Sequence, residues 1–330
     1  METECLTADA EGIARAAALL AAGEPVAIPT ETVYGLAADA RDATAVARVY
    51  AAKGRPAFNP LIVHLADLAA AERVAHFDED ARALAGAFWP GPLTLVLPLR
   101  ADAGIAALVT AGLDSVALRV PAHPVARAVL DAFGGPLAAP SANPSGRVSP
   151  TRAAHVLDAE TGLGGRIAAV LDGGACPVGV ESTILGRNAD GGWQLLRPGG
   201  LPVEAIAEAL GRAPAPPATR QATGATGAVT SPGQLASHYA PRAALRVGAE
   251  APRSGETWIG FGAQGDELSL SPTGDLVEAA ARLFDLLRQA DALGRPIAVA
   301  RIPDHGLGAA INDRLRRAAT PPHPADASLS

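Results

Sequence analysis

The sequence of 330 residues is short of lysine: Lys53 is the single lysine among 27 basic residues, and all the others are arginines. Asparagine and tyrosine are also scarce, with four and three residues respectively. Richness in alanine and arginine with so little lysine is typical of a compositional bias in the source genome. Under such a bias a rare residue type carries more information than a common one, so Lys53 is a first candidate for a functional role.

Only two cysteines are present, and Cys5 and Cys176 match neither a disulfide framework nor a metal-ligand spacing. Cys176 also has no nearby histidine partner, so we interpret it as structural. The first residues are acidic where a secretory leader would be basic. The apolar run "IARAAALLAAG" is short and is interrupted by Arg15, which argues against a membrane span. We therefore expect a cytoplasmic protein without a membrane partner.

The charge balance is acidic, with a formal net charge of −7 and a pI of about 5.5. Proteins that mainly grip nucleic acid are usually basic, because phosphate contacts supply most of their non-specific affinity. The acidic balance therefore disfavours a protein whose main task is to bind nucleic acid. A local basic patch is still compatible with this net charge. The length favours two domains, and 49% hydrophobic residues suffice for a substantial core.

Helical and strand patterns alternate along the first two hundred residues, which indicates an α/β domain. The expected helices cover 9–22, 42–52, 78–89, 123–133 and 149–160, and the expected strands cover 24–29, 60–65, 93–98, 115–121, 136–140, 168–174, 182–186 and 193–199. The composition then changes to Pro, Gly, Ala and Thr. We predict a catalytic-type domain over 1–210, a linker or lid over 211–240, and a small α/β domain over 241–330 with a disordered tail.

The segment "YAAKGRPAFNPLIVHL" places Lys53 and Arg55 in a loop after a helix and before a strand. A compact ammonium beside a guanidinium fork suits a polyphosphate. The alternative is a solvated helix end whose cations complement the helix dipole. The rarity of lysine favours the functional interpretation. For His64, taken alone, a satisfied core histidine is the better interpretation.

Two further segments concentrate hydroxyl groups near strand ends. In "IPTETVYGL", Thr30 and Thr32 flank Glu31, and these threonines either bind a ligand or satisfy the backbone of a turn. The loop "APSANPSGRVSPTR" carries Ser141, Asn143 and Ser149 among other polar residues. We expect Ser149 to cap a helix that begins at Pro150, which would make the loop either an anion site or an ordinary polar loop.

Polar residues also interrupt apolar strands. Arg119 lies inside such a strand and needs a carboxylate partner from the protein or from a ligand. Ser182 and Arg197 are similar, and His238 and Tyr239 follow the linker. The run "GFGAQG" fits a dinucleotide-binding pattern, but no helix pattern follows it, so we do not interpret it as a nucleotide site.

Taken together, these segments resemble the threonylcarbamoyl-AMP synthase family, also called YrdC-like proteins. The matching motifs occur in the family order and are "PTETVYGL", "AKGRPAFNPLIVHL", "WPGPLTLVL", "VALRVPAHP", "APSANPSGRVSPT", "GVESTIL", "LRPG" and "SPGQLASHYAP". The resemblance implies a YrdC-like twisted open mixed sheet with flanking helices, followed by a small Rossmann-like α/β domain.

The resemblance also implies a reaction, in which L-threonine, bicarbonate and ATP give threonylcarbamoyl-adenylate, pyrophosphate and water. Mg²⁺ is expected with the ATP, with no protein-only metal site. Other proteins would transfer the product to tRNA in the t6A modification, and direct tRNA binding is left open.

By the match, Lys53 and Arg55 would be catalytic. The ATP-binding residues would be Lys53, Arg55, Asn59, Ser115, Ser141, Asn143, Ser149, Arg197, His238 and Tyr239, and the threonine-binding residues Thr32, His64, Arg119, Ala139 and Ser182.

Two other interpretations compete with this one. The first is a module that binds double-stranded RNA or tRNA without catalysis, in which the arginines would cluster on an exposed face. The second is a different enzyme that forms a carbamoyl-adenylate. It would share the ATP motifs and differ around Thr32, His64 and Ser182.

Overall fold

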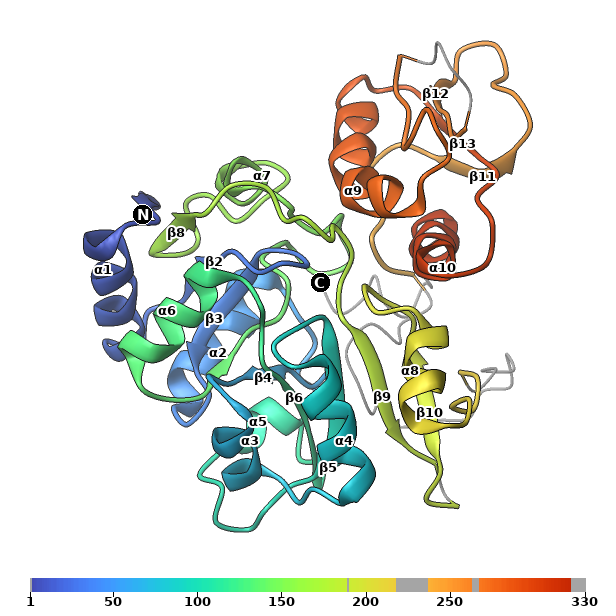
Figure 1. Cartoon of the computed structure of the whole chain (residues 1–330). Coiled ribbons are helices and arrows are strands. Elements are labelled where there is room, and N and C mark those ends of the chain that lie inside the picture. The colour runs from blue at the N-terminus through green and yellow to red at the C-terminus, as the bar shows by residue number, and fades with distance from the viewer. Residues whose placement is uncertain (1, 189, 218–236, 263–266, 322–330) are drawn as a thin grey trace.

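The computed structural model describes residues 2–188, 190–217, 237–262 and 267–321. These residues form a ten-stranded mixed sheet flanked by helices, and a separate three-stranded parallel sheet near the C-terminal end (Figure 1). The predicted α/β class, with a mixed sheet and a small Rossmann-like unit, is confirmed. Most of the predicted linker, residues 218–236, lies outside the described residues, as does the tail from residue 322.

The strands of the large sheet mix parallel and antiparallel neighbours. In their order across the sheet they are β1 (Glu4–Thr7), β8 (Ala169–Asp172), β2 (Val26–Ile28), β3 (Gly35–Asp39), β7 (Leu137–Ala138), β4 (Ile62–His64), β6 (Ser115–Arg119), β5 (Leu93–Pro98), β9 (Thr183–Arg187) and β10 (Trp193–Arg197). The small sheet has the order β11 (Leu245–Ala249), β13 (Ile297–Ala300) and β12 (Thr257–Ile259). Strands β4 and β6 are parallel and adjacent, so their carboxyl ends meet at one edge.

Several helices begin at polar caps, including the expected one at Asp42. Asp42 caps α2 by accepting a hydrogen bond from the backbone of Thr44, and Asp275 caps α9 in the same way. The helices are α1 (Ala10–Ala21), α2 (Ala43–Lys53), α3 (Leu68–Val74), α4 (Glu79–Phe88), α5 (Ala107–Thr110), α6 (Pro124–Phe133), α7 (Ala153–Leu157), α8 (Val203–Leu210), α9 (Leu276–Ala292) and α10 (Leu307–Ala319). Among the described residues, no helix combines the length and apolar character needed to cross a membrane.

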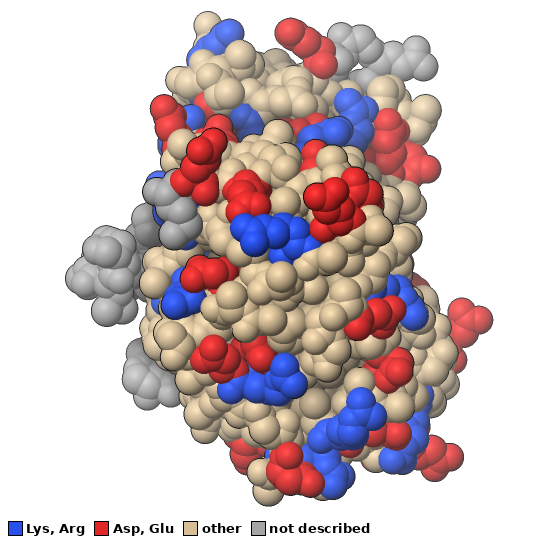
Figure 2. All heavy atoms as spheres, turned by 90° about the vertical axis from the view of Figure 1, so that its left-hand side faces the viewer, with Lys and Arg blue, Asp and Glu red and all other residues tan. Residues whose placement is uncertain are grey.

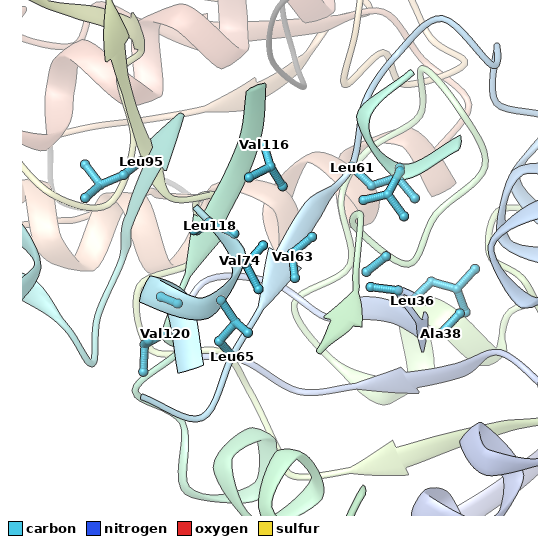
Figure 3. Packing of buried hydrophobic residues seen from close by; sticks show 14 of the residues in the cluster. Leu36, Ala38, Leu61, Val63, Leu65, Val74, Leu95, Val116, Leu118 and Val120 are labelled. Atoms are coloured by element: carbon cyan, nitrogen blue, oxygen red, sulfur yellow. The ribbon is translucent and has the colours of Figure 1, made fainter. Parts of the chain in front are cut away.

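Alternation along the strands explains the main core. On β6, Val116 and Leu118 face one side of the sheet, and Ala117 between them faces the other. Leu118 packs in the same cluster as Val63 of β4 and Leu95 of β5, and all three are completely buried (Figure 3). Each such side chain contributes roughly 1.5–3 kcal/mol of hydrophobic stabilisation, so this cluster holds the strand ends of the sheet in fixed positions.

The C-terminal unit shares its core with the large unit. Phe284 and Leu287 of α9 are fully buried in a cluster that also contains Val33, Val148 and Val180 from the first two hundred residues. In Figure 1, α9 and α10 lie on the side of this unit that faces the large unit. The two units are therefore joined by a continuous apolar contact.

Two local predictions were wrong. Lys53 is the last residue of α2 and does not lie in the following loop; the helix ends at Gly54, which has a positive φ of 59°. Ser149 does not cap a helix, because α7 begins at Ala153 and the Ser149 hydroxyl donates to Glu181 instead. A buried acceptor elsewhere in the fold competed successfully for the hydroxyl.

We predict that Gly179→Ala disrupts the contact between the two units. Gly179 has a φ of 74°, and a Cβ there would lie 2.3 Å from the Ala280 carbonyl oxygen and 2.4 Å from the Ala281 Cα on α9. Gly174→Ala is the matched control, because Gly174 has a φ of 83° with no atom within 4 Å of its Cβ position. Both changes should cost about 1–2 kcal/mol for the backbone conformation, and Gly179→Ala a further ~1–3 kcal/mol for the clash. The free energy of unfolding in urea measures both, and equal losses would contradict the close packing of α9.

Candidate functional site

A small cavity of about 50 Å³ lies at the carboxyl ends of β4 and β6, beside the turn that follows β2. This is the edge at which open α/β sheets commonly bind ligands. Most of the residues predicted from the sequence line it: Thr32, Arg55, His64, Arg119, Ala139, Ser141, Ser182, Arg197, His238 and Tyr239. Segments far apart in the sequence therefore meet here, as predicted.

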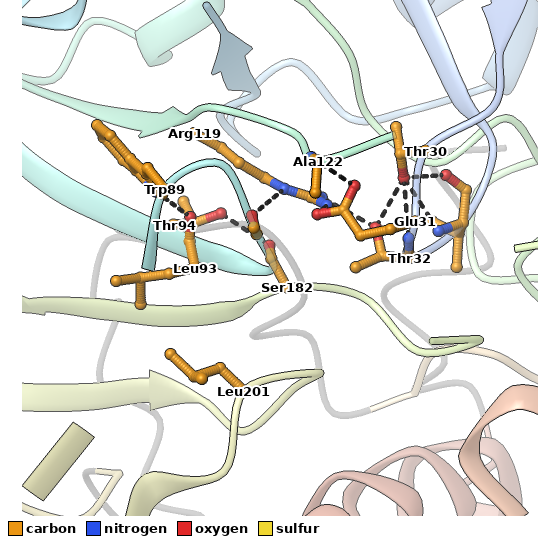
Figure 4. Close-up of polar contacts among 12 residues, drawn as sticks. Thr30, Glu31, Thr32, Trp89, Leu93, Thr94, Arg119, Ala122, Ser182 and Leu201 are labelled. Atoms are coloured by element: carbon orange, nitrogen blue, oxygen red, sulfur yellow. Dashed lines mark hydrogen bonds and ion pairs between the residues drawn. The ribbon is translucent and has the colours of Figure 1, made fainter. Parts of the chain in front are cut away.

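Arg119 is the centre of one half of the cavity. Its guanidinium donates to Glu31 at 2.5 Å, to the Thr32 hydroxyl at 2.9 Å and to the carbonyl of Gly91 at 3.2 Å (Figure 4). The carboxylate partner expected for this buried arginine is thus supplied by the protein. Glu31 also accepts from the backbone N–H of Ala122 at 3.1 Å, which fixes the carboxylate between two segments.

The two threonines of the turn have different tasks. The Thr30 hydroxyl donates to the carbonyl of Val33 at 2.7 Å and accepts from the backbone N–H groups of Thr32 and Val33. It therefore satisfies the turn backbone. The Thr32 hydroxyl lies between Thr30, at 2.8 Å, and Arg119, so it faces the cavity as part of a polar chain.

His64 is held as a neutral side chain. It is paired in register with Arg119 at the ends of β4 and β6, and its Nδ1 lies 3.3 Å from the carbonyl of Ile62. Burial, assisted by the nearby Arg119 charge, lowers the pKa of His64 to about 3. For Glu31 burial acts to raise the pKa, but Arg119 outweighs it, and the carboxyl pKa lies below its usual value. This half of the cavity therefore contains an ion pair and a neutral imidazole at neutral pH.

The other half is lined or backed by buried cations that have no ion-pair partner among the described residues. Within the described ranges, no carboxylate lies within 4 Å of the charged nitrogens of Lys53, Arg55 or Arg197. Lys53 donates to the carbonyls of Ser141 and Asn143, and Arg55 donates to the carbonyl of Asn59 at 3.2 Å. Burial lowers the pKa of Lys53 well below its usual value and that of Arg55 to about 10. An anionic ligand would reverse this cost by pairing the charges.

Two amide side chains beside these cations also have unused hydrogen-bonding capacity. Both side-chain polar atoms of Asn59 and the side-chain oxygen of Asn143 are buried and find no partner among the described residues. Leaving such a group unsatisfied costs roughly 1–3 kcal/mol. In proteins such groups are rare, and they mark places where a ligand, ion or water completes the bonding.

Ser182 joins the two halves of the cavity. Its hydroxyl lies 2.7 Å from the Thr94 hydroxyl and accepts from Arg197 at 3.2 Å, and its carbonyl also accepts from Arg197 at 2.8 Å. Arg197 is the last residue of β10, and Ser182 comes directly before β9. The antiparallel pairing of these two strands therefore sets the position of the arginine beside the serine.

His238 and Tyr239 close the cavity on the side of the C-terminal unit. Tyr239 is buried, stacks on Phe284 of α9 at 5.6 Å between ring centroids, and has a φ of 63°. A positive φ is unfavourable for a tyrosine, and strained residues of this kind cluster at functional sites. The backbone N–H of the next residue, Ala240, donates to the carbonyl of Gly146 at 2.8 Å. The segment is thus fixed against both units.

Four predicted residues stand directly behind the cavity wall, and one stands apart. Lys53, Asn59, Asn143 and Ser149 do not line the cavity but are hydrogen-bonded to residues that do, or to each other. Ser115 is the first residue of β6, roughly 13 Å along the strand from Arg119. The role of Ser115 in ATP binding stays a prediction.

The sequence analysis missed one charged side chain that lines the cavity. Glu181 is buried, accepts from the Ser149 hydroxyl at 2.5 Å and from Arg314 of α10 at 2.8 Å. Burial acts to raise its pKa, but Arg314 and then Arg197 lower it to about 2. A carboxylate between apolar residues next to Ser182 was the available signal, whereas nothing in the sequence around Arg314 marks it.

Comparison with known proteins gives consistent matches over most of the chain. A family model for Sua5, YciO and YrdC, described as "Telomere recombination", matches residues 18–199. A second model, described as "Threonylcarbamoyl-AMP synthase, C-terminal domain", matches residues 201–320.

Individual relatives agree with these matches. The chain is 42% identical to the threonylcarbamoyl-AMP synthase of Bacillus subtilis, over 96% of this chain and 95% of that protein. It is 41% identical to the threonylcarbamoyl-AMP synthase of Pyrococcus abyssi, over 92% of both. The crystal structure of P. abyssi Sua5 complexed with L-threonine superposes with a TM-score of 0.84 at 38% identity, covering 97% of this chain and 98% of that one.

We predict that His64 makes the fold less stable as the pH falls. Its pKa is lowered to about 3 in the folded protein, whereas an unfolded histidine titrates near 6.5. The unfolded state therefore binds more protons below that value, so stability is present above it and is lost as the pH decreases. Between about pH 7 and about pH 5 the loss from this one side chain should be roughly 2 kcal/mol.

Urea unfolding of the wild type and of His64→Gln at both pH values measures this effect. The variant should lose about 2 kcal/mol less than the wild type over this interval. His76→Gln is the control, because His76 is exposed and lies outside the cavity. If His64→Gln and the wild type showed the same pH dependence, His64 would not be held neutral in the fold.

Proposed function

The chain belongs to the threonylcarbamoyl-AMP synthase family, and we propose that it converts L-threonine, bicarbonate and ATP into threonylcarbamoyl-adenylate, pyrophosphate and water. The observation that carries the proposal is the division of one cavity into two halves. One half offers buried cations that no carboxylate of the described residues neutralises, and the other offers a fixed polar chain around Arg119. A polyphosphate and an amino acid match the charge and the polar groups of these two halves.

The ATP half is built around Lys53, Arg55 and Arg197. Lys53 supplies a compact charge and also holds the loop after β7, because its ammonium donates to the carbonyls of Ser141 and Asn143. Arg55 supplies a planar fork next to the unsatisfied amide of Asn59. Interactions of this kind with phosphate oxygens are charge-assisted and stronger in a buried setting.

The threonine half is built around Arg119, Thr32, His64 and Ser182. The relative from P. abyssi was crystallised with L-threonine, which supports an amino-acid site in the matching region of this chain. The threonine zwitterion offers a carboxylate for Arg119 and an ammonium group that the hydroxyls of Thr32 and Ser182 can bind. After reaction with bicarbonate, these hydroxyls can bind the carbamate. Neutral His64 can donate or accept without adding charge to this half.

The chemistry requires positioning more than a protein nucleophile. The threonine amine and bicarbonate form a carbamate with loss of water, and a carbamate oxygen then attacks the α-phosphorus of ATP while pyrophosphate leaves. Arg55 and Lys53 would stabilise the charge that builds on the phosphate oxygens, and the protein gains rate by holding both reactants in line. Tyr239 and His238 would exclude water from the labile mixed anhydride.

Mg²⁺ enters this proposal with the ATP. Among the described residues, no group of three or more His, Cys, Asp or Glu side chains is placed to hold a metal ion. The neutral oxygen of the Asn59 amide, buried and without a partner in the described chain, fits a hydrated Mg²⁺ on the triphosphate. When bound, the ion neutralises phosphate charge.

The RNA-binding interpretation is less well supported. Arg119 and Arg197 are buried and face the cavity, so they cannot form an exposed surface for a nucleic acid. On the face drawn in Figure 2, basic and acidic side chains alternate and do not merge into a basic patch. We therefore propose that separate proteins carry the adenylate onward to tRNA. We also propose that the protein acts in the cytoplasm.

The decisive assay incubates the protein with ATP, Mg²⁺, bicarbonate and each amino acid in turn, and measures pyrophosphate and the mass of the adenylate. The expected result is pyrophosphate release that depends on threonine, with one threonylcarbamoyl-adenylate formed per pyrophosphate. A parallel reaction replaces bicarbonate and amino acid with carbamoyl phosphate. Pyrophosphate release in that reaction alone would favour the other carbamoyl-adenylate-forming enzyme, and no threonine-dependent product would overturn the proposal.

We further predict that Arg55→Lys lowers kcat/KM for ATP about 10- to 100-fold. The substitution keeps the charge but removes the fork that donates to the carbonyls of Asn59 and Pro60. Arg41→Lys is the control, since Arg41 pairs with Asp39 on the surface, away from the cavity. Steady-state kinetics with varied ATP and saturating threonine measures the effect, and a value within twofold of wild type would exclude Arg55 from ATP binding.

A further inference from the structure

Glu181 is an anion in the half of the cavity that is lined by cations. Glu181, Arg55 and Arg197 line the same small cavity, so these three charges lie close together. A polyanionic substrate would be repelled by an uncompensated carboxylate at this position. The structure must therefore neutralise Glu181 if ATP is to bind beside it.

Arg314 supplies that neutralisation from the C-terminal unit. The side chain is 0% exposed, its Nε donates to Glu181 at 2.8 Å, and its terminal nitrogen donates to the carbonyl of Pro198 at 2.6 Å and to Asp313 at 2.9 Å. Glu181 and Arg314 are 133 residues apart, and the arginine belongs to α10. Both carboxylate oxygens of Glu181 are engaged, one by Arg314 and one by the Ser149 hydroxyl.

The same guanidinium also reaches the segment that closes the cavity. Its central carbon lies 5.3 Å from the ring centroid of Tyr239, in a cation–π arrangement. The backbone N–H of His238 donates to the carbonyl of Arg317, one turn further along α10, at 3.3 Å. Helix α10 therefore contacts two parts of the nucleotide half directly, the carboxylate of Glu181 and the segment of His238 and Tyr239. It also fixes the Ser149 hydroxyl indirectly, because Glu181 is the acceptor of that hydroxyl.

We propose that Arg314 is a positioning residue of the nucleotide site, which neutralises and orients Glu181 and so makes tight ATP binding depend on the docked C-terminal unit. The inference rests on the proposed function. It assigns the C-terminal unit a part in substrate binding through charge, beyond holding the fold together. If a neutral residue replaces Arg314, Glu181 becomes an unpaired buried anion that faces the triphosphate, and the Ser149 hydroxyl loses its fixed acceptor.

The first test is Arg314→Gln. We expect KM for ATP, and the Kd of a non-hydrolysable ATP analogue, to rise about tenfold or more, as for removal of one partner from a coupled buried pair. KM for threonine should stay within about twofold, because the hydrogen bonds of Arg314 go to Glu181, Pro198 and Asp313 and not to the threonine half. The matched control is Arg316→Gln, which changes an exposed arginine on the same helix and should leave both constants unchanged.

Two further variants separate charge from shape. Glu181→Gln removes the anion but keeps the side-chain shape, so the analogue should bind as tightly as to wild type or more tightly. The double variant Glu181→Gln/Arg314→Gln should recover most of the affinity lost in Arg314→Gln. Near-ultraviolet circular dichroism checks the fold of each variant, and Glu181→Gln decides the question where Arg314→Gln does not fold.

The outcomes are distinguishable. An unchanged Kd in folded Arg314→Gln would overturn the inference, as would weakened binding in Glu181→Gln or no recovery in the double variant. Failure of the proposed function would appear differently, as absence of threonine-dependent product in the wild type while analogue binding still follows the expected order.

Discussion

The constraint on which this structure depends is the cost of holding several cations out of water around one small cavity. A buried charge is stable only when a partner or hydrogen bonds offset its lost hydration. Arg119 and Arg314 receive carboxylate partners from the protein, whereas in the described residues Lys53, Arg55 and Arg197 receive only uncharged oxygen acceptors. The protein thereby divides its cavity into a compensated half and an uncompensated half. That division determines which substrate each half can accept, since the uncompensated half attracts phosphate oxygens.

The polar groups around the cavity form connected chains that cross most of the architecture. Thr94, Ser182 and Arg197 connect the central strands to the end of the sheet, and Ser149, Glu181 and Arg314 connect the loop side to the C-terminal unit. Chains of this kind are strong only when every member is satisfied. Removal of one member therefore leaves the next member of the chain without one of its hydrogen bonds.

Much of the fold and of the site could be predicted from the sequence, because polar residues at the ends of apolar strands are conspicuous. Arg119 was found in this way, whereas His64 was assigned to the site only through the family resemblance; the two lie in register at the ends of β4 and β6. Strand β3 was missed because its sequence, "GLAAD", contains no β-branched or aromatic residue, and it is a strand only through its pairing with β2 and β7. Arg314 could not be found, since only the docking of α10 turns one arginine of a basic helix toward a carboxylate 133 residues away.

The apolar contact between the two units has a consequence for the evolution of such chains. Val33, Val148 and Val180 are buried because α9 covers them, and Phe284 packs against the same cluster. A shorter descendant that ended after α8 would expose these valines to water, with a tendency to associate through them. Loss of the C-terminal unit would thus require polar replacements at those positions or a new partner over the same surface. The two units look like separate modules, but the large unit depends on the C-terminal unit to cover these valines. A deletion of the C-terminal unit would therefore have to be compensated at several positions at once.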